Sequence, residues 1–243
     1  MVFATWTIFL IHLVVSQRYV AFLRPEFGIL LAAAHLIAMG FMLAAMVRPK
    51  AAELDMSAVL RALVLLVPVL YAVVMPDTML GNQAFKKRFI GNANPVVGRR
   101  NQSMPSFKGA ENNPGSPASP GEIEGARQET PQERTILELF LNPDFYKGRR
   151  VIVTGMILRD EKLKPYFGGL DTAVYRFLIT CCAADALPLA IALDSVQTEA
   201  FANDQWVQVD GIFGLRQTDG KPAPVVSKAK IRPIEPPAVP YLF

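Results

Sequence analysis

The first third of the chain is dominated by three long apolar stretches. Residues 27–47 carry no charged side chain over 21 positions, which is enough for a helix to cross a bilayer. Residues 2–23 and 56–75 are also mainly apolar, although Arg18 interrupts the first and Arg61 the second. The pattern predicts a transmembrane region at residues 1–80 with about three helices. A secretory signal peptide is the competing interpretation of the first stretch.

Basic residues in the flanks of these stretches predict their orientation, because short cytoplasmic loops carry an excess of Lys and Arg. The first loop and the tail after the third stretch would share one side of the membrane, and they contain eight basic residues: Arg18, Arg24, Lys86, Lys87, Arg88, Arg99, Arg100 and Lys108. The other side has Arg48 and Lys50, or three basic residues if Arg61 is counted with them. We therefore predict a multi-pass protein of the cell membrane (inner or plasma) with a cytoplasmic C-terminal module.

A polar segment separates the apolar region from the rest. Residues 81–130 are first basic and then rich in Pro, Gly and Ser, a composition that cannot bury enough apolar surface to fold. We predict a flexible linker. Its cluster Lys86, Lys87 and Arg88 is expected to lie at the membrane surface and bind anionic lipid headgroups.

Alternating apolar and polar positions indicate a small β module at residues 131–243. The order Thr130-Pro131-Gln132-Glu133 has the form of a capping box and predicts a short leading helix. Strands are expected at residues 151–158, 175–181, 188–193, 206–213 and 225–234. Five short strands with little helix predict an all-β, OB-like five-stranded barrel.

An internal repeat supports the barrel. Val151-x-Val153-x-Gly155 is echoed by residues 207–211, which also alternate valines and end in Gly211. Glycine within a strand often marks a bulge or a sharp bend. The repeat therefore predicts that the first and fourth strands are strongly bent neighbours.

The distribution of charge along the chain bears on which partners the β module can bind. The chain carries a formal charge of +4, but residues 131–243 contain 13 Lys/Arg and 13 Asp/Glu, so the β module is neutral. Nucleic-acid binding needs a cationic docking surface, and we expect no nucleic-acid partner. Trp206 and Phe213 resemble a base-stacking platform, but in a neutral module they are assigned to the barrel core and a partner surface, together with Tyr241.

The two cysteines of the chain are adjacent, and Asp185 follows three residues after Cys182. Cys181, Cys182 and Asp185 are suitable ligands for zinc or copper. Neighbours on a strand point to opposite faces, so both sulfurs reach one ion only if the chain has already turned, and residues 183–186 are typical of such a turn. The alternative interpretation places one cysteine in the barrel core and the other in a groove.

Histidine placement argues against an enzyme. The chain has two histidines, His12 and His35, and both lie in apolar stretches, so the cysteines lack a base to activate them. We expect no catalytic residue, with thiol-based redox activity as the alternative. His35 and Arg61 are intramembrane polar residues, which either line a pathway or form a helix–helix hydrogen bond and a snorkelling contact, respectively.

Four segments together carry a family resemblance: residues 148–155, 181–186, 206–211 and 237–241. With the three apolar stretches and the polar linker before them, they resemble the YcgQ-like family of permease subunits. These are small membrane proteins with a C-terminal domain of unknown function. The resemblance implies a multi-span YcgR-like permease as partner and a link with metal handling, and it supplies no catalytic residue.

Two functional hypotheses follow. The first is a membrane-anchored accessory subunit of a multi-span permease, whose soluble module regulates or assists transport. The alternative is a metal-carrying or thiol-redox module that uses Cys181 and Cys182 with Asp185.

Overall fold

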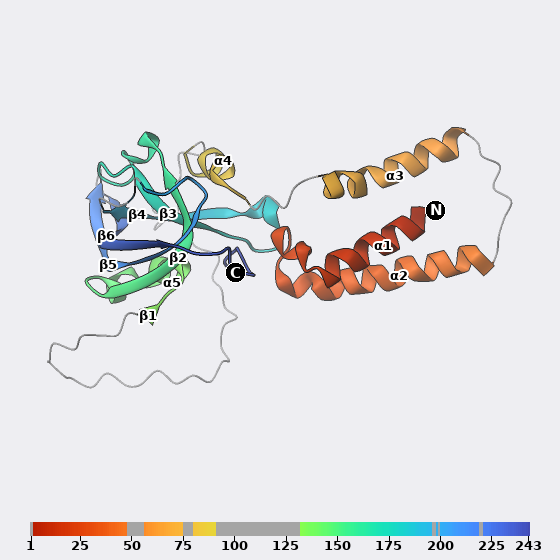
Figure 1. Cartoon of the computed structure of the whole chain (residues 1–243), viewed down its shortest axis with the longest axis horizontal. Helices are drawn as coiled ribbons and strands as arrows, with labels where there is room; N and C mark the ends of the chain where they lie inside the picture. Colours follow the sequence, from red (N-terminus) through yellow and green to blue (C-terminus); the bar gives the residue numbers. More distant parts are fainter. Residues whose placement is uncertain are drawn as a thin grey trace. The chain divides into compact units, whose positions relative to one another are not determined.

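A computed structural model describes residues 2–47, 56–74, 80–90, 132–195, 198, 200–218 and 221–243 (Figure 1). Most of the predicted linker, residues 91–131, lies outside the described residues. The chain forms two compact units. One contains Met1–Gly81 with Phe177–Leu187 and Pro237–Phe243, and the other contains Asn82–Arg176 with Pro188–Pro236.

Five strands in the described part of the chain close into a barrel, which confirms the predicted five-stranded barrel (Figure 1). They are β2 (Arg150–Arg159), β3 (Thr172–Leu178), β4 (Leu187–Asp194), β5 (Trp206–Thr218) and β6 (Lys221–Pro233). The order is β2-β3-β4-β6-β5, and β5 pairs back onto β2 to close the ring. β4 and β6 run parallel, whereas β2 is antiparallel to both β3 and β5.

The repeated valine–glycine motifs face one another across the β2–β5 pair. Val151 lies opposite Gly211, and Gly155 lies opposite Val207, so the predicted neighbour relationship is confirmed. The register of β5 against β6 shifts between Asp210 and Ile212, which is the predicted bulge. A Cβ at Gly211 would lie 2.5 Å from Val226 Cγ1 and 2.7 Å from a backbone oxygen, so glycine is required by close packing.

The leading helix starts later than predicted. Residues 132–133 form the short strand β1 (Gln132–Glu133), which is parallel to β2, and helix α5 (Ile136–Leu141) follows. The cap is Thr135, whose hydroxyl accepts the backbone N–H of Glu138 at 3.1 Å. Thr135 to Glu138 repeats the same Thr-x-x-Glu spacing, so the pattern identified the right kind of cap at the wrong threonine. Helix α6 (Pro143–Tyr146) then leads into β2.

The start of the predicted linker is folded. Residues 82–90 form α4 (Asn82–Phe85) and a π-helical turn, η3 (Lys86–Ile90), within the same unit as most of the barrel. Phe85 and Phe89 are buried, and their rings stack at 4.7 Å between centroids. Phe85 also lies 4.6 Å from the Tyr175 ring. The two phenylalanines are four residues apart and share one helical face, so this segment belongs to the barrel module.

The N-terminal part contains α1 (Val2–Val15), α2 (Gly28–Val47) and α3 (Met56–Val74), with the short 3-10 turns η1 (Arg18–Ala21) and η2 (Pro25–Phe27) before α2. Among the described residues, one helical stretch is long and apolar enough to cross a membrane, Pro25–Val47, with 23 residues. The expectation of about three such helices is corrected by this finding.

Local sequence explains why α1 falls short. Helix α1 has 14 residues, about 21 Å at 1.5 Å per residue, against the ~30 Å hydrocarbon core. It stops before Gln17, which adopts the left-handed conformation with φ of 54°. Helix α3 has 19 residues and contains Arg61 and Pro68, and among its described residues Val59–Tyr71 form a shorter apolar stretch.

Candidate functional site

The two cysteines lie in a turn. Strand β3 ends at Leu178, earlier than the predicted residue 181, and a 3-10 turn, η6 (Ala183–Asp185), leads into β4. The cysteines therefore do not alternate across a strand. Their Sγ atoms lie 3.7 Å apart, and we call residues 180–185 the cysteine loop.

Asp185 folds back over the start of this loop. Its carboxylate accepts the backbone N–H of Cys181 at 2.8 Å and that of Thr180 at 3.1 Å. Partial desolvation raises the pKa of Asp185, but hydrogen bonds from the Cys181 thiol and from these N–H groups outweigh it and hold the pKa below its usual value. The carboxylate is thus ionised and oriented toward the sulfurs.

The same carboxylate sets the chemistry of Cys181. Its hydrogen bond with Asp185, followed by that with Cys182, raises the pKa of the Cys181 thiol to about 11. A thiol is nucleophilic only as the thiolate, and these hydrogen bonds favour the protonated thiol. A bound cation reverses this preference, because a coordinating thiol gives up its proton.

The donor atoms fit one metal ion. One ligand atom from each of Cys181, Cys182 and Asp185 lies within 4.8 Å of the others. Zn–S bonds of ~2.3 Å at a tetrahedral angle separate two sulfurs by about 3.8 Å, close to the 3.7 Å found here. Cys181 is exposed and Cys182 is half-buried, so an ion has access from solvent.

The cysteine loop is bonded along its backbone to the segment that precedes helix α2. The Arg24 N–H donates to the Cys181 carbonyl at 3.2 Å, and the Ala183 N–H donates to the Phe22 carbonyl at 2.8 Å. Leu23 and Cys182 form an antiparallel bridge between these two bonds. Sequence reasoning missed this pairing, since residues 22–24 carry no strand pattern.

The three aromatic residues assigned to the barrel or a partner surface are all buried. Phe213 is fully inaccessible, and Trp206 and Tyr241 are 5% and 3% exposed. Trp206 packs its ring under the Arg176 guanidinium, 5.5 Å from the ring centroid. These residues are part of the folded core and do not present a contact surface.

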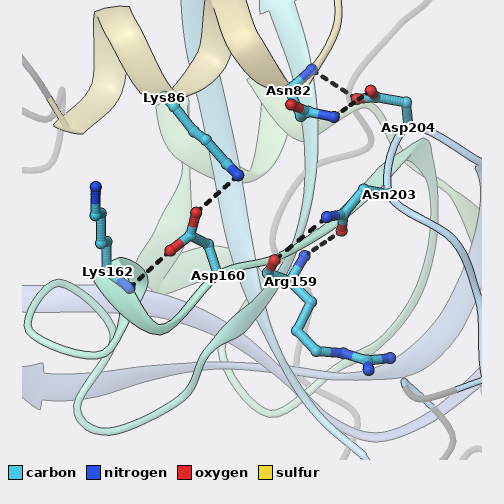
Figure 2. Close-up of polar contacts among 7 residues, drawn as sticks. All are labelled: Asn82, Lys86, Arg159, Asp160, Lys162, Asn203 and Asp204. Carbon is cyan, nitrogen blue, oxygen red and sulfur yellow. Dashed lines mark hydrogen bonds and ion pairs between the residues drawn. The ribbon is translucent and has the colours of Figure 1, made fainter.

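The predicted membrane-surface cluster begins with a residue that contacts the barrel. Lys86 Nζ lies 2.8 Å from the Asp160 carboxylate, as Figure 2 shows. The hydrogen bond from Lys86 is the main reason that the pKa of Asp160 is lowered. Lys87 and Arg88 follow on the same turn, η3. Lipid binding by this cluster stays a prediction.

Asp204 is a polar node that sequence reasoning missed. Its carboxylate accepts two hydrogen bonds from Asn82, from the backbone N–H at 2.6 Å and from the side-chain amide at 2.5 Å (Figure 2). It also accepts the Tyr175 hydroxyl at 2.5 Å. Next to it, Asn203 Oδ1 accepts the Arg159 N–H at 2.7 Å. The Asn-Asp pair before β5 was the available sequence signal, because both residues favour tight turns.

The two residues predicted to be intramembrane and polar, His35 and Arg61, lie on different helices. His35 on α2 has its Nδ1 atom 3.2 Å from the Thr7 carbonyl oxygen on α1, which favours the helix–helix hydrogen bond over a pathway role. The Phe3 and Phe41 rings stack at 5.5 Å between the same two helices. Arg61 lies on α3 and is exposed.

These features define a class: a closed five-stranded barrel on a chain that also holds a helix of membrane-spanning length. Residues 133–243 match the family model described as the DUF1980 C-terminal domain. The match supports grouping the barrel module with that family, whereas the name of a YcgQ-like permease subunit has no support from it. No curated protein and no solved structure gives a match.

Proposed function

We propose that this chain is a membrane-anchored metal-binding protein, in which Cys181, Cys182 and Asp185 take up a zinc ion. The observation that carries the proposal is the separation of the two sulfurs, 3.7 Å, which suits tetrahedral zinc without rearrangement. Adjacent cysteines reach this separation only because the chain turns directly after β3.

Zinc fits the donor set better than copper(I) does. Two thiolates and a carboxylate combine soft and hard ligands, which zinc accepts, whereas copper(I) binds soft sulfur donors. Asp185 supplies the third ligand from a carboxylate already oriented by two backbone N–H groups. Three protein ligands leave a fourth position open, so the ion is expected to exchange rather than to serve as a closed structural centre.

The contacts of the cysteine loop also bear on the membrane arrangement. Residues 22–24 bond to the loop before α2 begins, and Leu80, after α3, donates its N–H to the Tyr241 hydroxyl at 3.2 Å. Tyr241 in turn donates to the Ala21 carbonyl at 3.0 Å, so residues 21 and 80 meet at one side chain. If α2 crosses the membrane, the chain has to return, and we propose that α3 provides the return crossing.

In this arrangement the metal loop lies on the cytoplasmic side. Both ends of the α2–α3 hairpin then share a side with the basic residues before and after it, whereas Arg48 and Lys50 occupy the other side. Helix α1 is too short to add a full crossing. The orientation is therefore the same as that expected from the charge distribution of the sequence.

A second candidate is the accessory subunit of a multi-span YcgR-like permease. It is favoured by α2, on which no residue is buried among the described parts of the chain and which exposes Leu36, Ile37 and Phe41 to a partner helix or to lipid. Copurification of a multi-span protein that persists after Cys181→Ser and Cys182→Ser would support this candidate independently of metal.

Equilibrium dialysis of the full chain in detergent against zinc tests the main proposal. We expect one zinc per chain for the wild type and loss of binding in the Cys181→Ser/Cys182→Ser variant. Asp185→Asn is expected to weaken zinc binding but to leave copper(I) binding nearly unchanged. Zinc binding that persists in the double variant would overturn the proposal.

A further inference from the structure

Tyr241 joins three segments that are far apart along the chain. Its hydroxyl donates to the Ala21 carbonyl at 3.0 Å and accepts the Leu80 N–H at 3.2 Å. The side chain is 3% exposed, so both bonds are shielded from water. Ala21 ends the 3-10 turn η1, which lies ahead of α2 in the chain, and Leu80 follows α3. One hydroxyl group therefore bonds to the segment that leads into α2 and to the segment that follows α3.

The C-terminal tail that carries Tyr241 is itself tied to the strand leading into the cysteine loop. The Leu242 N–H donates to the Phe177 carbonyl at 2.8 Å, and the Ile179 N–H donates to the Leu242 carbonyl at 3.0 Å. Leu178 and Leu242 form a parallel bridge at the same place. The tail and the cysteine loop are therefore consecutive parts of one hydrogen-bonded structure.

The cysteine loop is also bonded to residues 22–24, which precede α2. The Cys181 carbonyl and the Ala183 N–H, which flank the two sulfurs, both bond to residues 22–24. An ion that fixes both sulfurs and Asp185 restricts the backbone dihedrals of residues 181–185. The carbonyl of Cys181 and the N–H of Ala183 are then held in the positions in which they bond to residues 22–24.

We propose that metal binding at the cysteine loop stabilises the junction formed by residues 21–24, Leu80 and Tyr241, and so couples metal occupancy to the ends of helices α2 and α3. This inference rests on the proposed zinc site. Coupling is reciprocal, so weakening the junction weakens metal binding by the same factor. A hydrogen bond contributes about 0.5–1.5 kcal/mol net, which corresponds to a factor of about 2 to 12.

Hydrogen exchange of the full chain in detergent, read by mass spectrometry with and without zinc, tests the coupling. We expect zinc to slow exchange about 2- to 12-fold at residues 22–24 as well as in the cysteine loop. Cys181→Ser/Cys182→Ser should abolish both effects. Tyr241→Phe should still bind zinc, with an affinity about 2- to 12-fold lower and less protection at residues 22–24.

Tyr146→Phe is the matched control, because it removes a hydroxyl from the other unit and should change neither quantity. Zinc binding with protection confined to residues 180–185 would overturn the coupling and leave the metal site standing. Unchanged zinc affinity in Tyr241→Phe would also contradict the coupling. Absence of zinc binding in the wild type would overturn both the coupling and the proposed function.

Discussion

The backbone N–H of Arg24 donates a hydrogen bond to the carbonyl oxygen of Cys181 at 3.2 Å. Arg24 is the last residue before the turn that opens the membrane-length helix, and Cys181 offers one of three potential metal ligands. The bond places the candidate ligand directly against the beginning of that helix.

Gly211→Ala should destabilise the barrel by about 1–3 kcal/mol, because the added Cβ meets Val226 and a backbone oxygen at the bulge. The matched control is Gly214→Ala on the same strand, where the nearest atom is 3.7 Å away and ordinary contact results. Denaturant unfolding of the full chain, followed by Trp206 fluorescence in a Trp6→Phe background, measures both. Equal stability of the two variants would contradict the assigned bulge.

Phe85→Ala should destabilise the barrel module by about 3–5 kcal/mol, the usual cost of removing a fully buried ring. Phe145→Ala removes a 56% exposed ring, which lies 4.0 Å from the Arg149 guanidinium, and should cost about 0.5–1 kcal/mol. The same unfolding measurement applies. If Phe85→Ala costs no more than Phe145→Ala, residues 82–90 are not an integral part of the barrel module.

The buried Tyr175 hydroxyl predicts a loss of stability at alkaline pH. Burial, followed by the hydrogen bond to Asp204, raises the pKa of Tyr175 well above its ordinary value. The stability contribution is therefore complete below the unfolded-state pKa of ~10 and declines as the pH rises above it, because the unfolded chain ionises first. Unfolding free energies measured from about pH 8 to about pH 11 should fall more steeply for the wild type than for Tyr175→Phe. Parallel curves would show that Tyr175 is not buried as a neutral hydroxyl.

The proposed return crossing predicts opposite sides for two positions. A reporter fused after Val47 should act as an external domain, and the same reporter fused after Phe243 should act as a cytoplasmic one. Alkaline phosphatase, which is active outside, and a fluorescent protein that folds in the cytoplasm give complementary signals. The same sidedness for both fusions would rule out the hairpin of α2 and α3.

Barrel architecture was predictable because its determinants are local. The valine–glycine repeats indicate alternating strands and place glycine at the two crowded positions. Gly155 and Gly211 therefore predict, from the sequence alone, that their two strands are neighbours. The threonine cap was recognised by type but misplaced, because Thr130 and Thr135 head the same Thr-x-x-Glu spacing. Local patterns determine the kind of element better than its first residue.

The turn at residues 183–186 was recognisable from the sequence, but the earlier end of β3 was not, because distant residues decide where that strand ends. Leu178 pairs with Leu242, and Cys182 pairs with Leu23, so partners from both ends of the chain fix this turn. Phe85 and Phe89 did carry a helical spacing, but the intervening lysines and arginine suggested a solvated linker. Asp204 gave no signal beyond that of an ordinary turn residue, because its partners, Asn82 and Tyr175, come from elsewhere in the sequence.

The most direct test of the metal site is cobalt(II) substitution, because cobalt–thiolate bonds give a charge-transfer absorption that scales with the number of coordinated sulfurs. Titrated into the full chain in detergent, cobalt should give a two-thiolate intensity at one ion per chain. Cys181→Ser and Cys182→Ser should each halve it, the double variant should abolish it, and zinc should displace it. A wild-type spectrum without thiolate charge transfer would contradict the assignment of Cys181, Cys182 and Asp185 as a metal site.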